Sequence, residues 1–172
     1  MNKPILYILC GIPFSGKSTL AQKLAKQLGF VRVDLDEVKF EMFGDDIQEE
    51  EIDQAGWNKV YHEMYKRIRD NLQEGKVVLH DTGNFTKYER DLVRKEAEKV
   101  GVVSKVLFVK VPVETARERW VENKRTKKRF DISKEAFEEA VDEMEEPSVE
   151  KNVIGYNNND SLDDLIRKIK ST

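Results

Sequence analysis

The chain has 172 residues, of which 39% are hydrophobic and 37% are charged, and its net charge is −3. This length suits one domain with a sizeable core. No apolar run approaches the roughly 18 residues that a membrane span needs. The near balance of 30 basic and 33 acidic residues excludes a global attraction to nucleic acid or acidic lipid.

Hydrophobic periodicity predicts strands and helices that alternate along the chain. The apolar run 5–9, which ends before Gly11, is typical of a fully buried strand, and apolar residues at helical spacing follow it over 18–28. The further elements are a strand at 30–35, a helix at 52–72, a strand at 77–80, a helix at about 86–100, a strand at 102–111, a helix at about 113–123, a basic loop at 124–131, a helix after Ser133, a short strand at 152–156 and a last helix after Asp160 or Ser161. This alternation predicts one α/β domain over residues 1–172, with helices on both faces of a parallel sheet.

Residues 11–19 form the most specific motif in the chain. They read GIPFSGKST and match G-x-x-x-x-G-K-[ST] at every defined position, between a predicted strand and a predicted helix. Glycines let the backbone turn its N–H groups toward a phosphate, and the helix N-terminus adds a favourable dipole. We therefore predict an ATP site in which Lys17 reaches the β- and γ-phosphates and Ser18 ligates Mg²⁺. The predicted nucleotide-binding residues are Gly11, Pro13, Ser15, Gly16, Lys17, Ser18 and Thr19.

A second magnesium ligand is expected at Asp81. This residue follows the buried run 77–80, and ligands bind at the carboxyl edge of a parallel sheet. Asp81 can hold the ion through a metal-bound water. The alternative is an aspartate that only caps a helix or a turn before Gly83.

The motif at 11–19, the pair Asp36 and Lys39, and the segment DTGN at 81–84 together resemble the P-loop kinases. The similarity is closest to the 5′-hydroxyl polynucleotide kinases and the small ATP-binding "AAA domain" kinases grouped with them, and it spans residues 5 to about 156. It implies a three-layer P-loop NTPase sandwich of the nucleoside/nucleotide-kinase type, with five parallel strands and the P-loop strand in the centre. It also implies transfer of the ATP γ-phosphoryl group to an acceptor hydroxyl.

The resemblance implies that Asp36 is the general base and that Lys39 contacts the acceptor, because they occupy the family's Asp-x-x-Arg positions. Lys39 replaces the family's arginine, and an ammonium group lacks the planar fork that binds a phosphate with two bonds. Asp34 lies two residues earlier on the same face of the predicted strand, so it is an alternative base.

The resemblance also implies a basic lid at about 117–131. Arg119 lies at the family's distance from the strand end at 111–112, and Arg125 is displaced by about two residues from the second lid arginine. Both are expected to join Lys17 in stabilising the transferring phosphoryl group. The alternative is a solvated basic helix end.

The segment between the second and third predicted strands, about 36–75, is longer than a usual crossover helix. In P-loop kinases this insertion carries the acceptor site. Trp57, Tyr61 and Tyr65 are four residues apart and share one helix face, so they can stack on an aromatic or sugar acceptor. Periodicity alone favours a core stripe instead.

These features predict an ATP-dependent kinase with ATP and Mg²⁺ as cofactors. The net negative charge favours a small-molecule acceptor, whereas the motif similarity favours the 5′ end of a nucleic acid, as in a 5′-hydroxyl polynucleotide kinase. The alternative of another class is an ATP-dependent hydrolase or a regulatory nucleotide-binding protein. The sequence has no Asn-Lys-x-Asp guanine motif, and Thr82 rather than a glutamate follows Asp81, which disfavours a GTPase or a motor.

The single cysteine, Cys10, fits a reducing compartment, and the first residues show no separate apolar segment with a cleavage site. We therefore expect a cytoplasmic protein without a membrane partner. The identity of the acceptor and the oligomeric state are left open.

Overall fold

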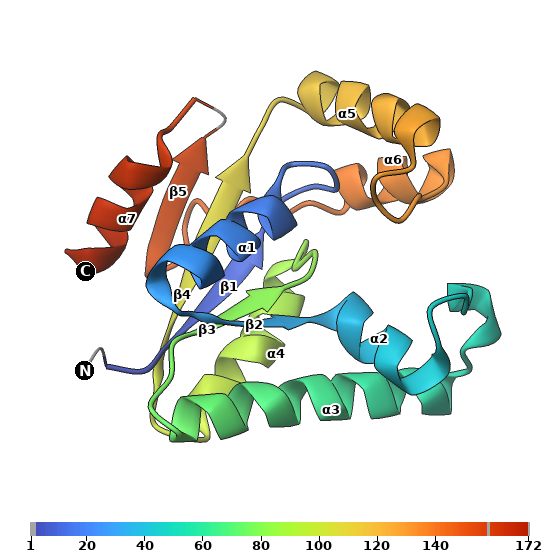
Figure 1. The fold of residues 1–172 in the computed structure, drawn as a ribbon. Helices are drawn as coiled ribbons and strands as arrows, with labels where there is room; N and C mark the ends of the chain where they lie inside the picture. The colour runs from blue at the N-terminus through green and yellow to red at the C-terminus, as the bar shows by residue number, and fades with distance from the viewer. Residues whose placement is uncertain (1–2, 158, 172) are drawn as a thin grey trace.

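The computed structural model describes residues 3–157 and 159–171, and these form a three-layer α/β sandwich (Figure 1). The sheet has five parallel strands in the order β2-β3-β1-β4-β5, so the strand before the P-loop is central, as expected. The strands are β1 (Ile5–Cys10), β2 (Val31–Asp34), β3 (Val78–Asp81), β4 (Val103–Lys110) and β5 (Val153–Asn157).

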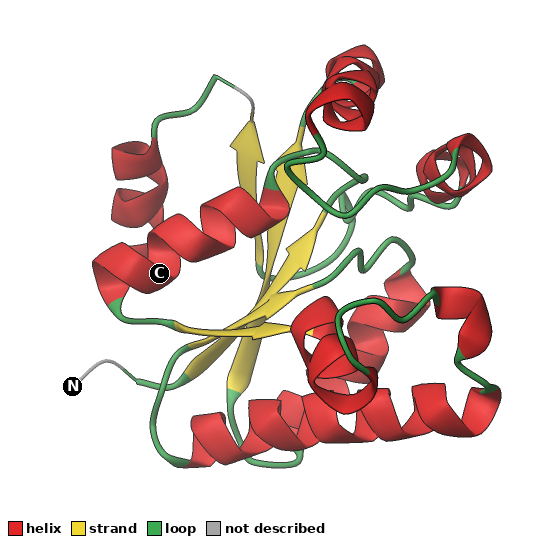
Figure 2. Cartoon of the chain, turned by 45° about the vertical axis from the view of Figure 1, so that its right-hand side comes forward, coloured by secondary structure: helices red, strands yellow, loops and turns green. Residues whose placement is uncertain are grey.

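Helices cover both faces of the sheet and extend beyond its carboxyl edge (Figure 2). In chain order they are α1 (Lys17–Leu28), α2 (Leu35–Phe43), the short 3-10 helix η1 (Glu49–Glu51), α3 (Gln54–Gln73), α4 (Lys87–Glu98), α5 (Val113–Thr126), α6 (Lys134–Asp142) and α7 (Leu162–Lys170). Helices α1 and α7 pack on one face, and α3 and α4 pack on the other. Helices α5 and α6 share a separate cluster that includes Trp120 and Phe137.

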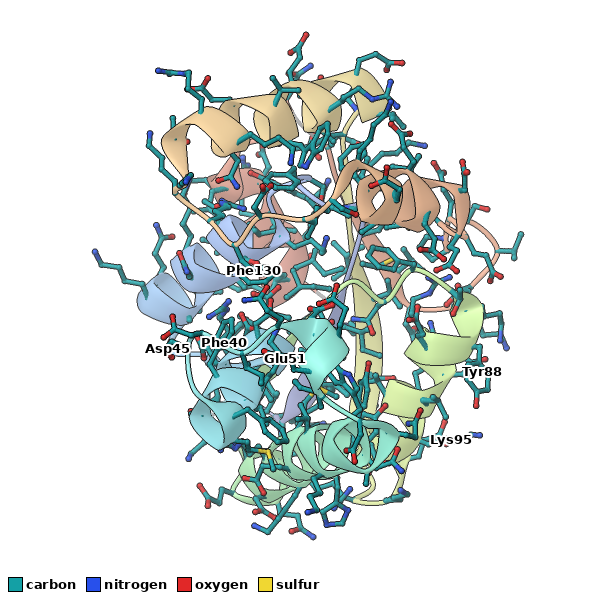
Figure 3. The ribbon with its side chains drawn as sticks, turned by 90° about the vertical axis from the view of Figure 1, so that its right-hand side faces the viewer. Phe40, Asp45, Glu51, Tyr88, Lys95 and Phe130 are labelled. Atoms are coloured by element: carbon teal, nitrogen blue, oxygen red, sulfur yellow. The ribbon has the colours of Figure 1, made fainter. Side chains whose placement is uncertain are left out.

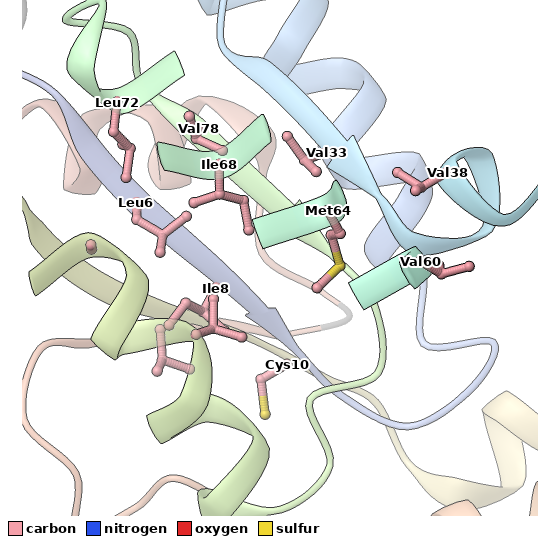
Figure 4. Packing of buried hydrophobic residues seen from close by; sticks show 13 residues of the cluster. Leu6, Ile8, Cys10, Val33, Val38, Val60, Met64, Ile68, Leu72 and Val78 are labelled. Carbon is pink, nitrogen blue, oxygen red and sulfur yellow. The ribbon is translucent and has the colours of Figure 1, made fainter. Parts of the chain in front are cut away.

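The central strand β1 explains why both faces must be covered. Its side chains alternate between the two hydrophobic clusters, with Leu6 and Ile8 on the α3 side and Tyr7 and Leu9 on the α1 side. The α3 side is closed by an apolar stripe at helical spacing (Figure 4), whose members are Val60, Met64, Ile68 and Leu72.

The structure corrects the sequence prediction at two places. Residues 35–43 form the helix α2. The sequence pattern predicts a strand at 30–35 and no helix between that strand and the acidic run. The Asp34 carboxylate ends β2 and caps α2, because it accepts hydrogen bonds from the backbone N–H groups of Asp36 at 2.7 Å and Glu37 at 3.3 Å. Helix α5 also continues to Thr126, so only the start of the predicted basic loop is helical.

None of the helices in the described ranges is long and apolar enough to span a membrane.

Replacing Ile68 by Ala should lower the free energy of unfolding by about 2–5 kcal/mol, because this side chain is fully buried between α3 and the sheet. Urea denaturation measures this change. The matched control on the same helix is Lys59→Ala, an exposed position, for which the change should stay within about 0.5 kcal/mol. A loss at Ile68 no larger than at Lys59 would contradict the packing of α3 on the sheet.

Candidate nucleotide and acceptor site

The P-loop crosses the carboxyl edge of the sheet between β1 and α1, and its glycines are required there. A Cβ on Gly11 would lie 2.5 Å from the Val109 carbonyl oxygen, and Gly16 caps α1 with a φ of 103°. Ser15 Oγ is buried and has no hydrogen-bond partner among the described residues. Such an orphaned polar atom in a phosphate cradle fits a bound phosphate that would satisfy it.

Lys17 lies in the cradle, where its ammonium group donates to the carbonyl oxygens of Gly11 at 2.7 Å and Ile12 at 2.9 Å. Burial lowers the pKa of Lys17 to about 8, although the charge of Asp81 acts in the opposite direction. A bound phosphate would favour the charged ammonium form. Lys17 therefore lies where the P-loop motif predicts a phosphate ligand.

The metal-binding side of the cradle is formed by Ser18 and Asp81. The Ser18 hydroxyl donates to Asp81 Oδ1 at 3.3 Å, so the P-loop helix and the end of β3 meet here. A hydroxyl and a carboxylate are the hard oxygen donors that Mg²⁺ prefers. No group of three or more His, Cys, Asp or Glu side chains among the described residues could hold a metal ion by itself. The two residues thus fit a magnesium ion that takes its other ligands from phosphate and water.

Arg32, which sequence reasoning missed, holds the carboxylates at this edge together. Its guanidinium donates to Asp81 at 2.7 Å and also pairs with Asp34 and Glu37. Strands β2 and β3 are in register with Asp34 opposite Asp81. Burial and then repulsion by Asp81 raise the pKa of Asp34 to about 6. The spacing of Arg32 and Asp34, two residues apart on one strand face, was the available signal.

Asp34 and Asp36, the two alternative bases, have different surroundings. Asp34 is buried, caps α2 and pairs with Arg32, so its oxygens are engaged. Asp36 lies in the first turn of α2 with its side chain 54% exposed, and its carboxylate accepts from Lys39 at 2.8 Å. The geometry therefore leaves Asp36 accessible to an acceptor.

Lys39 is fully buried, so its ammonium group is not presented to an acceptor. It bonds to Asp36 and to Glu49 and lies against the rings of Phe40 and Phe130. Burial alone would lower the pKa of Lys39, but the bonds to Asp36 and Glu49 raise it above its ordinary value.

The aromatic row of α3 lies beside the core stripe. The ring centroids of Trp57 and Tyr61 are 6.1 Å apart, and those of Tyr61 and Tyr65 are 6.2 Å apart. Trp57 and Tyr65 pack against the core, whereas Tyr61 is 41% exposed. Burial raises the pKa of Tyr61, and the charges of Glu89 and Glu49 raise it further. Only Tyr61 of this row has substantial exposed surface for an acceptor.

The basic lid brings two arginines to the P-loop. Arg119 donates to the carbonyl oxygens of Phe14 and Ser15, each at 3.2 Å, and Arg129 donates to the Thr19 hydroxyl. Arg125 is instead paired with Glu122, and its side chain is 76% exposed. In this structure Arg129, rather than Arg125, is the second arginine of this segment that contacts the P-loop helix.

Asn123 fixes the path of the loop that carries Arg129. Its side-chain amide donates to the Arg129 carbonyl at 3.1 Å and accepts from the Arg129 backbone N–H at 2.9 Å. The Trp120 indole donates to the Ile132 carbonyl at 3.0 Å. Asn123 is buried, and no periodicity or motif in the sequence marked it.

A cavity of about 640 Å³ lies between α1, α5 and the end of β5. Its lining includes Gly16, Thr19, Arg119, Arg129, Tyr156 and Asn157. This volume is in the range of small-molecule and cofactor sites. In the strand order β2-β3-β1-β4-β5, Asp36 follows β2 and the cavity lies at the end of β5, on the other side of the P-loop strand β1, so the site has a cavity side and an α2 side.

The loop after β3 is tied to the P-loop strand by buried polar groups. Asn84 adopts a positive φ of 49° and donates to the Leu9 carbonyl at 2.6 Å. Arg90, another residue that sequence reasoning missed, is fully buried, pairs with Glu150 and donates to the carbonyl of Phe85 at 2.9 Å. The centroid of the Phe85 ring in turn lies 5.9 Å from the Lys17 ammonium. These contacts position the wall of the cradle.

Residues 6–147 match the model of a protein family described as "AAA domain". The chain belongs to this family of small P-loop kinase-like proteins. It is 32% identical to the shikimate kinase of Clostridium botulinum (strain Loch Maree / Type A3) over 120 residues, which make up 66% of this chain. The match spans 64% of the length of that curated relative.

Solved structures share the fold of this AAA-domain family member. Chaetomium thermophilum Kti12 in complex with ADP-AlF3 superposes with a TM-score of 0.75 at 21% identity, over 96% of this chain and 97% of that chain. A chain of the Pnkp1/Rnl/Hen1 RNA repair complex superposes with a TM-score of 0.68 at 23% identity, over 83% of this chain and 44% of that chain. At these identities the likeness concerns the fold alone.

Replacing Arg129 by Ala should weaken the binding of magnesium AMP-PNP by about tenfold or more, because the change removes a cation from the cavity wall beside the P-loop. The matched control is Arg125→Ala, which removes the same charge from the same lid and should change the affinity by less than about twofold. Isothermal calorimetry measures both. A larger loss at Arg125 than at Arg129 would contradict this placement.

Proposed function

We propose that the protein is an ATP-dependent phosphotransferase that moves the γ-phosphoryl group of ATP to a hydroxyl group of a small molecule. The observation that carries the proposal is the position of the P-loop strand β1 between β5, whose end lines the 640 Å³ cavity, and β2, which leads to the exposed Asp36. A transfer between two substrates needs a phosphate site with the nucleotide on one side and an acceptor on the other. The P-loop kinase-like family supports this arrangement.

The path from the phosphate site to Asp36 is short and continuous. Ser18 contacts Asp81, Asp81 is the register partner of Asp34, and Asp34 binds the backbone N–H of Asp36. A hydroxyl placed beside Asp36 would therefore lie at the same sheet edge as the phosphates.

In the proposed step, the acceptor oxygen forms a bond to the γ-phosphorus while the bond from that phosphorus to the β–γ bridging oxygen breaks. Asp36 takes the proton of the acceptor hydroxyl, and ADP leaves with the bond electrons. Lys17, Arg119 and Arg129 surround the phosphate site with positive charge and stabilise the transferring group. Magnesium held by Ser18 and Asp81 would neutralise phosphate charge.

Charge at the acceptor side favours a small molecule over a nucleic acid. Asp36, Glu37 and Glu49 have side chains that are more than half exposed. Their cationic partners Lys39 and Arg32 are 0% and 14% exposed. A polynucleotide would bring several phosphates to this rim and meet repulsion, whereas a neutral or cationic acceptor would not. The 5′-hydroxyl polynucleotide kinase remains the alternative, supported by the Asp36-x-x-Lys39 similarity.

Incubation of the protein with γ-labelled ATP, magnesium and a panel of acceptors should place label in one small molecule. The panel holds nucleosides, sugars, aminoglycosides, chloramphenicol and a 5′-hydroxyl oligonucleotide, with Lys17→Ala as the blank. Label in the oligonucleotide would favour the alternative acceptor class. Label released only as free phosphate, equally with and without the panel, would move the assignment to a hydrolase or a regulatory nucleotide-binding protein.

Replacing Asp36 by Asn should abolish transfer while leaving ATP affinity within about twofold, because the amide keeps the size of the side chain but takes no proton. The matched control is Glu37→Gln, which removes a carboxylate from the adjacent position of the same helical turn and should retain most of the activity. Rates and affinities are measured on both variants. If transfer survives in Asp36→Asn, Asp36 is not the base.

A further inference from the structure

Two segments from opposite sides of the P-loop meet at one cation. The Lys39 ammonium, on α2, lies 4.7 Å from the centroid of the Phe40 ring and 5.0 Å from that of Phe130, in the loop after α5. The two rings are themselves 6.1 Å apart and tilted by 56°. Figure 3 shows Phe40 and Phe130 near each other, on the side of the molecule where η1 also lies. The lid thus contacts the acceptor helix through an aromatic pair around a lysine.

Carboxylates complete the enclosure of this cation. Lys39 bonds to Asp36 at 2.8 Å within α2 and to Glu49 of η1 at 3.2 Å. The Lys39 side chain has no exposed surface, whereas Phe130 is 45% exposed. Phe130 therefore covers the ammonium group from the solvent side, and its loss would open Lys39 to water without leaving a cavity in the core.

The neighbouring residue ties this cover to the nucleotide side. Arg129 contacts Thr19 on the P-loop helix and lines the cavity, and Phe130 follows it directly in the chain. Consecutive Cα atoms are only about 3.8 Å apart, so the backbone path that brings Arg129 to Thr19 also fixes the position of Phe130. From that position the Phe130 ring contacts α2. Asn123 fixes the backbone of Arg129 with two hydrogen bonds, which limits other paths for this loop.

Removing water from a charged hydrogen bond strengthens it and restricts its geometry. Phe130 shields the Lys39 ammonium and with it the bonds to Asp36 and Glu49, whereas the Asp36 side chain is 54% exposed. We propose that Phe130 is a positioning residue that, when the lid lies over the P-loop, covers Lys39 and thereby orients Asp36 toward the acceptor. The catalytic consequence rests on the proposed function, because only phosphoryl transfer requires Asp36 to take a proton.

The cover is tested by chemical footprinting of the intact protein, which needs no acceptor. Limited acetylation followed by peptide mass spectrometry compares Lys39 with Lys66, an exposed lysine on α3. Acetylation of Lys39 should be at least about tenfold slower than that of Lys66 in the unmodified chain, and Phe130→Ala should remove most of this protection. Phe130→Tyr, which keeps the ring, should restore it, and Phe130→Leu should not. The matched control is Val121→Ala, an exposed apolar side chain on α5.

The orientation of Asp36 is tested in the same samples by carbodiimide coupling of a glycine ester to carboxylates. Phe130→Ala should raise the ratio of Asp36 modification to Glu37 modification. The ratio should move toward that of Lys39→Met, which lacks the bond between residue 39 and Asp36 altogether. Magnesium AMP-PNP should increase the protection of Lys39 in the unmodified chain and not in Phe130→Ala. Lys39 and Asp36 reactivities that do not depend on residue 130 would overturn the proposal, and a nucleotide effect that persists in Phe130→Ala would overturn the link to lid closure.

Activity then separates this inference from the proposed function. With the acceptor that takes label from ATP, Phe130→Ala should lower kcat by about tenfold at an unchanged KM for ATP, and Phe130→Tyr should recover it. An unchanged kcat would overturn the catalytic role of the cover. If no acceptor takes label, the proposed function fails, while the footprint still decides whether Phe130 holds the Lys39–Asp36 pair.

Discussion

The guanidinium of Arg32 is the contact on which the arrangement of the site depends. Three carboxylates, those of Asp34, Glu37 and Asp81, come together at the ends of β2 and β3, and Arg32 bonds to all three. Without a cation these carboxylates would repel one another, and repulsion by Asp81 adds to burial in raising the pKa of Asp34. Because Asp34 also caps α2, the same charge balance sets where α2 begins.

The phosphate cradle and the alternation of strands and helices along the chain could be predicted from the sequence because both depend on local patterns. The segment 11–19 needs glycines at fixed positions for backbone reasons, and a buried parallel strand is a short apolar run. Helix α2 escaped prediction because Leu35 extends the apolar run of β2 and the following turn is dominated by charge. Helix α2 could have been recognised from Asp34 as its N-cap, the acidic residues of its first turn and Gly44 after its last turn.

The choice among the basic residues of the lid could not be made from the sequence. Seven arginines and lysines occur in residues 117–129, and composition treats them alike. Which of them joins Arg119 at the P-loop depends on the bonds between Asn123 and Arg129, which act across the end of α5 and the start of the following loop. The burial of Lys39 is a similar case, since a ring that lies against its ammonium belongs to Phe130, about ninety residues away in the chain. Contacts of this kind are properties of the folded chain alone.

The two tryptophans of the chain occupy the two sides that enclose the P-loop. Trp120 is on α5, where its indole N–H is bonded to the Ile132 carbonyl in the loop before α6, and Trp57 is on α3, beside Tyr61. Indole emission responds to local polarity and hydrogen bonding. The molecule therefore carries one intrinsic optical reporter on α5 and one on α3, and substitution of either indole leaves a spectrum that follows the other helix alone.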